Sequence, residues 1–374
     1  ATTEIYTLSL HDALPISLEA DIVGLSFSVK ANEGYYIPVE YPEKESKPGL
    51  TLDAVLEKLK LIFENDNNRF CGQNIKYDAL VLSRYGIHLG NIVFDSMIAE
   101  YMLHPEKNSY KMDYLSIDYL NYRMVPIVNL IGTGLHQKSM AEVPLEDIAF
   151  YASEDADIAF QLAEILKDKL EEESLFEPYN DIEIPLIPVL ITIEKNGVYL
   201  NLDFLADLSR QFGEGLEQLT EKIHQMAGRE FNINSPKQLG EILFDELELK
   251  PIRKRSTAVE VLEVLKNYHP LPEEVLKFRH LAKLKNTYVD AIPNYVNKVT
   301  GRVHTSLNQT IAATGRLSST SPNFQNIPIR TETGREVRKA FVPQNPDWVI
   351  LSADYSQVEL RIMAHYSQIG RAHV

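Results

Sequence analysis

The chain has 374 residues and a formal net charge of -16 at pH 7, and its length exceeds one compact core and predicts two or three domains. Hydrophobic residues make up 44% and charged residues 24%, as in ordinary globular proteins, and no apolar run approaches the ~20 residues that span a bilayer. The single cysteine, Cys71, excludes an internal disulfide and a cysteine-based zinc site, which favours a reducing compartment such as the cytoplasm.

The negative charge lies in the first half of the chain. Residues 1–180 hold 14 Lys and Arg against 30 Asp and Glu, whereas residues 181–374 hold 23 of each. Within the second half, residues 251–340 hold 15 basic and 7 acidic residues. Such a region can bind nucleic-acid phosphates although the whole chain is acidic. By charge alone, a solvated basic surface is an equal alternative.

An α/β layer fold is predicted for about residues 1–175. The first sixteen residues do not continue into the pattern that follows, in which residues 22–28 alternate like a strand. Strand and helix signals then alternate, as in α/β domains. The expected elements are helices at 52–63, 74–85, 112–120 and 145–173 and a short strand at 69–71.

Long helices with few strand signals are predicted for about residues 181–297. The Ser-Pro pair at 235–236 is an N-cap followed by a proline in the first turn, so a helix begins there. Another helix is predicted over 272–297. It carries several positive charges, and Arg279 and Lys283 lie one turn apart on one face.

The last part of the chain is expected to contain strands and turns over 304–330, which are rich in Ser, Thr, Asn and Gln. Residues 349–351 predict a short buried strand that leads to Asp354. A carboxylate at the end of a buried strand suits a divalent metal, because Mg²⁺ often uses one or two protein carboxylates plus substrate phosphates. Taken alone, Asp354 fits a turn equally well, and Ser356 with Glu359 fits a capping box that starts a helix.

Four stretches of the second half have specific sequences. They read Leu-Ala-Lys-Leu-Lys-Asn-Thr-Tyr at 281–288, Thr-Gly-Arg-Leu-Ser-Ser at 314–319, Pro-Asn-Phe-Gln-Asn-Ile-Pro at 322–328 and Asp-Tyr-Ser-Gln-Val-Glu-Leu-Arg-Ile-Met-Ala-His at 354–365. They resemble the thumb, the template-primer segment and motif A of the family A DNA polymerases, of the bacterial DNA polymerase I type. The resemblance implies that Asp354 is a catalytic metal ligand and that Glu359 screens the sugar 2′ position.

The same resemblance implies contacts to DNA and to the incoming nucleotide. Arg, Asn and Gln can hydrogen-bond the minor-groove acceptors that all base pairs share, as a polymerase requires. The alternative is that the Asn and Gln residues only close turns. The residues implied at the primer-template are Lys283, Arg316, Asn323, Gln325 and Asn326, and those implied at the nucleotide are Arg330, Tyr355 and Gln357.

Two stretches of the acidic half read Gly-Gln-Asn-Ile-Lys-Tyr-Asp at 72–78 and Tyr-Ala-Ser-Glu-Asp at 151–155. They resemble the second and third motifs of the family's 3′–5′ exonuclease domain. The resemblance implies that Asp78 and Asp155 bind metal and that Tyr151 orients the attacking water. Tyr151 and Asp155 are spaced to share one helical face. Taken alone, each of the two stretches is equally typical of an ordinary helical surface.

The resemblance breaks at both ends. The family's first exonuclease motif, Asp-x-Glu, is missing before residue 18, and residues after 368 do not continue the family pattern. The later polymerase motifs and the 5′ nuclease domain are absent as well. The expected parts are a non-native leader at 1–17, a ribonuclease-H-like α/β exonuclease domain at 18–175, a helical thumb at 176–300, a partial palm at 301–368 and a non-native tail at 369–374.

The sequence therefore predicts a fragment of a DNA-directed DNA polymerase with a proofreading exonuclease domain, acting in DNA replication and repair. The expected cofactor is Mg²⁺ at two-metal sites that are incomplete in this chain, so little activity is expected. The expected partners are primer-template DNA and, in the full-length parent, deoxynucleoside triphosphates; a monomer is expected in the bacterial cytoplasm at the nucleoid, with no membrane association. The alternative is a non-catalytic DNA-binding protein that reuses these folds.

Overall fold

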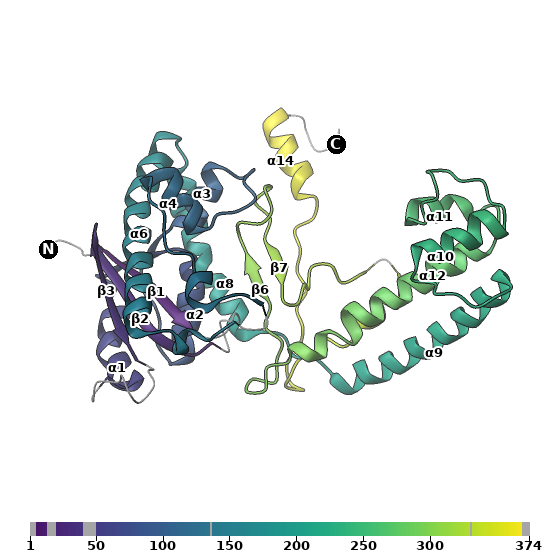
Figure 1. Ribbon diagram of the computed structural model, residues 1–374, viewed down its shortest axis with the longest axis horizontal. Helices are drawn as coiled ribbons and strands as arrows, with labels where there is room; N and C mark the ends of the chain where they lie inside the picture. The colour runs from purple at the N-terminus through teal and green to yellow at the C-terminus, as the bar shows by residue number, and fades with distance from the viewer. Residues whose placement is uncertain (1–4, 13–19, 40–49, 135–136, 330, 369–374) are drawn as a thin grey trace. The chain divides into compact units, whose positions relative to one another are not determined.

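The chain folds into two compact units (Figure 1). A computed structural model describes residues 5–12, 20–39, 50–134, 137–329 and 331–368. Unit 1 contains Ala1–Gly197 and His304–Gln325, and unit 2 contains Val198–Val303 and Asn326–Val374. The chain thus returns to unit 1 for one short segment after it has formed most of unit 2.

Unit 1 is built on a five-stranded sheet in the order β3-β2-β1-β4-β5. β2 is antiparallel to both β1 and β3, whereas β1, β4 and β5 run parallel to one another. The strands are β1 (Ile5–Asp12), β2 (Ile22–Lys30), β3 (Glu33–Pro38), β4 (Arg69–Gly72) and β5 (Ile92–Asp95). Helices connect the parallel strands, so the predicted α/β fold is confirmed.

Helices pack on this sheet, and the longest, α6 (Leu145–Glu172), contacts four of the five strands. Phe63 at the end of α1 packs against Phe27 and Phe70, with ring centroids 6.1 and 5.9 Å apart. All four helices predicted in this half are present to within about a residue. The unit also contains α1 (Leu52–Phe63), α2 (Ile75–Arg84), α3 (Ser96–Leu103), α4 (Met112–Leu120), α5 (Val128–Ile131), α7 (Phe176–Pro178) and α8 (Ile184–Asn196), with short turns at Met140–Glu142 and Tyr179–Glu183.

The strand β1 differs from expectation. Residues 1–17 are expected to lie outside the fold, but Ile5–Asp12 form the central strand of the sheet. From position 6 to position 11, apolar and polar residues alternate with the period of a strand. The backbone pairs on both sides, with Thr7 opposite Ser28 in β2 and Cys71 in β4. That these residues are foreign to the gene stays a prediction.

Unit 2 is mainly helical, and its two long helices pack against each other (Figure 1). Apolar side chains from the C-terminal part of the first long helix and from four later elements form one core, which includes Ile223, Leu239, Leu243, Leu262 and Val275. The helices are α9 (Leu202–Ala227), α10 (Pro236–Glu241), α11 (Val259–Leu265), α12 (Leu271–Leu284), α13 (Glu332–Arg338) and α14 (Val358–Ser367), with a π-helical turn at Ile242–Glu246. In the described part of the chain, no helix has the length and hydropathy that a membrane span requires.

Two expectations about helices in unit 2 have different outcomes. The predicted N-cap is confirmed, because the Ser235 side chain accepts a hydrogen bond from the N–H of Gln238 at 3.4 Å. The single helix expected over 272–297 is wrong: α12 ends at Leu284, and a π-helical turn (Lys285–Val289) and a 3-10 turn (Ile292–Tyr295) follow. Pro293, which has no N–H to continue an α-helix, accounts for the change at the last turn.

The strand expected over residues 349–351 is also wrong. Val349, Ile350 and Leu351 are 88%, 60% and 86% exposed, and no described strand pairs with them. A strand needs a neighbour to take its backbone hydrogen bonds, and without one these apolar side chains stay at the surface. Asp354 consequently lies on an exposed segment and not at the end of a buried strand.

Candidate functional site

Asp95, at the end of β5, holds the starts of two helices of unit 1. Its carboxylate accepts hydrogen bonds from the N–H groups of residues 97–98 in α3, at 2.9 and 3.2 Å, and from those of residues 74–75 at the start of α2, at 3.3 and 2.9 Å. N–H groups in the first turn have no partner inside their own helix, so one buried carboxylate caps both helices. Asp78 lies in the first turn of α2, and its position therefore depends on Asp95.

Replacing Asp95 with alanine is expected to lower the free energy of unfolding by about 2 kcal/mol, because the loss of one N-cap costs ~1 kcal/mol and this residue caps two helices. The variant Asp95→Asn keeps one oxygen acceptor and is expected to lose less. Urea unfolding followed by circular dichroism measures both variants. An unchanged midpoint for Asp95→Ala would contradict the shared cap.

The middle of α6 presents Tyr151 and Asp155 on one face, one helical turn apart. The Tyr151 hydroxyl donates a hydrogen bond to the buried Asp155 carboxylate. Burial is the main cause that raises the pKa of Asp155 to about 8; the charges of Glu154 and Asp113 act in the same direction, and the Tyr151 hydrogen bond opposes them. A carboxylate that is costly to ionise in this way gains from a bound cation.

An open cleft of about 660 Å³ lies beside this face of α6. Tyr151 and Asp155 line one part of the cleft, and the loop before α4 lines a second. A third part comes from Thr310 and Ile311, which belong to the segment that returns to unit 1 late in the chain. The cleft, which Gln73, Asn74, Met97 and Ile127 also line, therefore brings together acidic, basic and apolar side chains from several distant parts of the sequence.

The described residues fit a divalent metal only in part. Asp155 and Asp113 bring carboxylates of the kind that Mg²⁺ prefers to the cleft. Asp78 is buried on α2 and is not among the residues that line the cleft. Among the residues described, no three His, Cys, Asp or Glu side chains are grouped closely enough to hold a metal ion.

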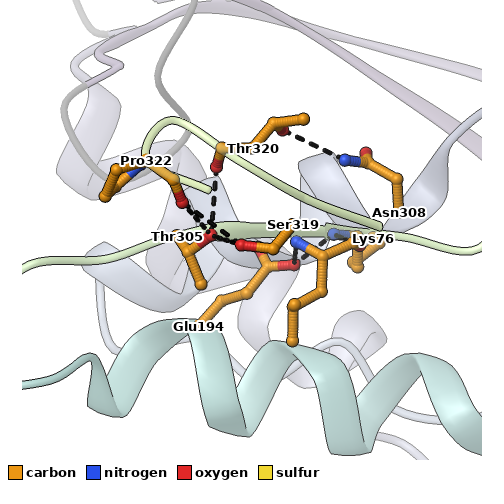
Figure 2. A network of polar contacts seen from close by, with 8 residues as sticks. Lys76, Glu194, Thr305, Asn308, Ser319, Thr320 and Pro322 are labelled. Atoms are coloured by element: carbon orange, nitrogen blue, oxygen red, sulfur yellow. Dashed lines mark hydrogen bonds and ion pairs between the residues drawn. The ribbon is translucent and has the colours of Figure 1, made fainter. Parts of the chain in front are cut away.

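A buried ion pair joins α2 and α8 to the hairpin of β6 (Ser306–Asn308) and β7 (Ser318–Thr320) (Figure 2). Lys76 of α2 pairs with Glu194 of α8, and their side chains are only 11% and 4% exposed. Lys76 also donates to the carbonyl oxygen of Leu307 at 2.7 Å, and Glu194 accepts from the N–H of Leu307 at 2.8 Å. The pair therefore fixes the backbone of β6.

The hydroxyl groups of Thr305 and Ser319 connect the two sides of this hairpin (Figure 2). Their oxygens are 2.7 Å apart, and the Thr305 oxygen also lies 3.0 and 2.9 Å from the carbonyl oxygens of Thr320 and Pro322. The predicted strands and turns in this segment are confirmed, and the hairpin that carries the template-primer stretch belongs to unit 1.

Gln325, expected at the primer-template, uses its side-chain amide within this loop. Its oxygen accepts from the N–H of Ser319 at 3.0 Å, and its nitrogen donates to the carbonyl oxygen of Leu317 at 3.0 Å. These contacts favour the turn-closing alternative for Gln325. Arg316 and Asn323 are exposed, and the Asn323 side chain accepts from the N–H of Gln325 at 3.0 Å.

Of the positive charges expected on α12, Lys283 is exposed. Two neighbouring cations are engaged inside unit 2. Arg279 donates to the carbonyl oxygen of Thr257 at 2.5 Å, and Lys285 lies 2.7 Å from the carboxylate of Asp290. Arg279 and Lys285 are thus engaged within unit 2, and Lys283 is better placed than these neighbours to meet a phosphate.

Two further residues expected at the DNA and the nucleotide lie between the hairpin and α13. Asn326 is exposed, and its backbone carbonyl accepts a hydrogen bond from the hydroxyl of Tyr288 at 2.6 Å. Arg330 lies outside the described residues.

The residues around the start of α14 are all exposed, including Asp354, Tyr355 and Glu359. Gln357 is the N-cap residue, with φ of 55°, and no side chain caps the helix. The capping box of Ser356 with Glu359 is therefore not formed.

Comparison with known proteins assigns both halves of the chain. Residues 15–171 match the 3′–5′ exonuclease family, and residues 202–371 match DNA polymerase family A. This chain belongs to the family A DNA polymerases. The family assignment agrees with the resemblance seen in the sequence and with an exonuclease fold followed by a helical polymerase region.

The named relatives of this chain are bacterial proteins. It is 42% identical to DNA polymerase I of Pseudomonas aeruginosa over 360 residues, which cover 94% of this chain and 39% of the relative. It is also 42% identical to DNA polymerase I of Chloroflexus aurantiacus over 358 residues, which cover 93% of this chain and 38% of the relative. The chain thus spans about 39% of the length of these relatives.

A solved structure is similar over nearly the whole chain. It is the POL domain of Pol1 from M. smegmatis in complex with DNA primer-template and dNTP, with a TM-score of 0.81 and 29% sequence identity. The match covers 98% of this chain and 60% of that chain.

The sequence alone did not reveal three residues that organise unit 1. Asp95 had a usable signal, because an Asp directly after a strand and before a helical pattern is a typical N-cap. The sequence gives no signal for the pair of Lys76 and Glu194, because the two residues are 118 positions apart and no spacing between them indicates a contact.

Proposed function

We propose that this chain is the proofreading region and the first part of the polymerase region of a template-directed DNA polymerase of replication and repair. The observation that carries the proposal is the order of the two family matches, exonuclease and then polymerase, with the expected site residues present in both. The relatives named DNA polymerase I support it over most of this chain.

In the exonuclease unit, we assign Asp78 and Asp155 to metal binding and Tyr151 to orienting the water that attacks the terminal phosphodiester. The hydrogen bond between Tyr151 and Asp155 supports roles in one site. The metal would be Mg²⁺, which would neutralise charge on the phosphate and lower the pKa of the bound water. The described ligands are too few for a complete two-metal site, so no step of the reaction is derived through the metal.

In the polymerase region, we assign Asp354 to metal binding and Glu359 to discrimination at the sugar 2′ position. Arg330, Tyr355 and Gln357 would meet the incoming deoxynucleoside triphosphate in the full-length parent. Lys283 of α12 would contact the primer-template together with Arg316, Asn323 and Asn326, and Gln325 would shape the loop that carries the last three. The bound DNA and dNTP of the M. smegmatis structure support these partners.

We further propose that the parent is a monomer in the bacterial cytoplasm, associated with the nucleoid. The second candidate function of this chain is DNA binding without catalysis. It is favoured because Asp354 is exposed and no three metal-ligand side chains are grouped among the described residues. The chain would then bind primer-template DNA without processing it, as a non-catalytic DNA-binding protein does.

Binding of a fluorescent primer-template tests the DNA partner. The affinity is expected to be independent of the DNA sequence. A plot of log affinity against log salt concentration is expected to fall with a slope of about 0.9 for each phosphate contact. A Lys283→Glu, Arg316→Glu variant is expected to bind roughly 60-fold more weakly at 0.1 M salt, since two contacts of about 0.9 log unit each are lost. Fluorescence anisotropy across a salt series gives both quantities.

The matched control is Lys58→Glu with Lys138→Glu, which changes the net charge equally at exposed positions of the exonuclease unit. This control is expected to bind nearly as well as the wild type. Equal losses in both double variants would mean that only net charge matters, and salt-independent binding would rule out the proposed phosphate contacts.

A further inference from the structure

The loop between β6 and β7 carries Arg316, which the proposed function places at the primer-template. Arg316 is exposed, but the backbone on each side of it is held. After it, the carbonyl oxygen of Leu317 accepts a hydrogen bond from the Gln325 side chain at 3.0 Å. Before it, the N–H of Gly315 closes a turn onto the carbonyl oxygen of Ala312 at 3.1 Å. The direction in which the Arg316 side chain leaves the loop therefore depends on two fixed points.

The fixed point before Arg316 is made by a helix from the exonuclease match. The hydroxyl of Tyr101 in α3 donates to the carbonyl oxygen of Ala312 at 2.7 Å and accepts from the N–H of Gly315 at 3.1 Å. Gly315 has φ of 75°, in the left-handed region that favours glycine. One hydroxyl thus holds both ends of the turn. Tyr101 lies in the stretch that matches the exonuclease family, whereas the turn lies in the stretch that matches DNA polymerase family A.

Tyr101 is itself fixed inside unit 1. It is buried, and its ring packs edge-on against the ring of Tyr110, with centroids 5.8 Å apart. The helix α3 is capped at its start by Asp95, and at its end the carbonyl oxygen of His104 accepts a hydrogen bond from the Tyr110 hydroxyl at 3.0 Å. Because the tyrosine is held in this way, its hydroxyl can keep the turn in one place.

We propose that Tyr101 is a positioning residue for primer-template binding and acts through its hydroxyl on the turn that precedes Arg316. The inference rests on the proposed contact between Arg316 and DNA, and it adds to that contact a residue of the exonuclease unit that lies outside the exonuclease motifs. Without the hydroxyl, the turn has more conformations in the free protein. These conformations must be given up when DNA binds, which lowers the affinity.

The test is a double-mutant cycle on the whole chain, with binding of a fluorescent primer-template measured by anisotropy in EDTA, so that the DNA is not cleaved. The variants are Tyr101→Phe, which removes only the hydroxyl, Arg316→Ala, and the two combined. The matched control is Tyr110→Phe. It removes another buried tyrosine hydroxyl beside α3, one that binds His104 and not the turn.

Tyr101→Phe is expected to weaken binding about fivefold at 0.1 M salt, because the turn is no longer ordered before DNA binds. Arg316→Ala is expected to weaken it about eightfold, the loss of one contact. The combined variant should bind no more weakly than Arg316→Ala alone, since Tyr101 acts through Arg316 and the two effects do not add. Tyr110→Phe should stay within about twofold of the wild type. Hydrogen exchange at the N–H of Gly315 should become faster in Tyr101→Phe and stay unchanged in Tyr110→Phe.

Two kinds of result would overturn the proposal, and they are distinguishable. If Arg316→Ala weakens binding but Tyr101→Phe matches Tyr110→Phe, or if the losses from Tyr101→Phe and Arg316→Ala multiply in the combined variant, the positioning role fails while the proposed DNA contact stands. If the wild type does not bind the primer-template, or if Arg316→Ala binds as tightly as the wild type, the proposed contact of Arg316 fails together with the inference.

Discussion

A labelled primer on its template should stay unextended when this 374-residue chain is supplied with Mg²⁺ and all four deoxynucleoside triphosphates. Phosphoryl transfer by polymerases uses two metal ions held about 3.5–4 Å apart by carboxylates. In the described part of this chain, Asp354 lies on an exposed segment and no three ligand side chains form a cluster. A lost metal ligand costs several kcal/mol of transition-state stabilisation, and each ~1.4 kcal/mol is tenfold in rate, so we expect a rate at least about a thousandfold below that of a complete polymerase.

A gel assay with end-labelled primer measures extension and shortening at once. Full-length DNA polymerase I of Pseudomonas aeruginosa serves as the positive control, because it is 42% identical to this chain. Primer growth that disappears in Asp354→Ala would refute the expectation for polymerisation. Little shortening is expected as well, and metal-dependent shortening that disappears in Asp155→Ala would refute that part.

The second large effect is expected from Lys76→Met, which removes the positive partner of the buried Glu194 carboxylate. Among the residues that the structure describes, the backbone N–H of Leu307 would remain as a hydrogen-bond donor to that charge. Breaking a buried ion pair by removing one partner costs about 3–5 kcal/mol, so the midpoint of urea unfolding of unit 1 should fall accordingly. Hydrogen exchange of the β6 backbone should rise in the same variant, because the Lys76 bond to the Leu307 carbonyl is lost too.

Two companion variants separate the buried pair from general effects of losing a lysine. Lys76→Met combined with Glu194→Gln should recover much of the loss, because no buried charge is left without its partner. Lys30→Met breaks the exposed pair with Glu33, whose side chains are 70% and 42% exposed, and should leave stability unchanged, since exposed pairs contribute little. A Lys76→Met variant as stable as the wild type would show that the pair does not hold the hairpin.

The boundary between the two family matches does not coincide with the boundary between the two units. Residues 304–325 lie inside the stretch that matches DNA polymerase family A, yet they fold with the unit that carries the exonuclease match. The Lys76–Glu194 pair and the Tyr101 hydroxyl provide the polar contacts that hold them there. A variant of this segment should therefore be examined for its effect on single-strand binding as well as on primer-template binding.

The sequence alone determined the family, the α/β and helical halves and the bounds of the four helices predicted in the first half. Residues that are close together in the sequence determine these features. Ser235 before Pro236 marks a helix start, and Tyr151 and Asp155 share a helical face whenever their segment is helical. Long motif stretches likewise identify the family without any knowledge of packing. The sequence did not predict that α12 ends at Leu284, because the π-helical turn that follows depends on the packing of the whole unit.

Only the tertiary structure decided which distant residues meet. Lys76 and Glu194 are separated by 118 positions, and Ile311 reaches the cleft of Tyr151 and Asp155 only because the chain returns to unit 1. It likewise decided that residues 349–351 form no strand, since an apolar run becomes a strand only where another strand takes its backbone hydrogen bonds. The spacing of residues in the sequence predicts local geometry. Strand pairing, side-chain burial and cleft formation depend on contacts between distant segments, which no local pattern predicts.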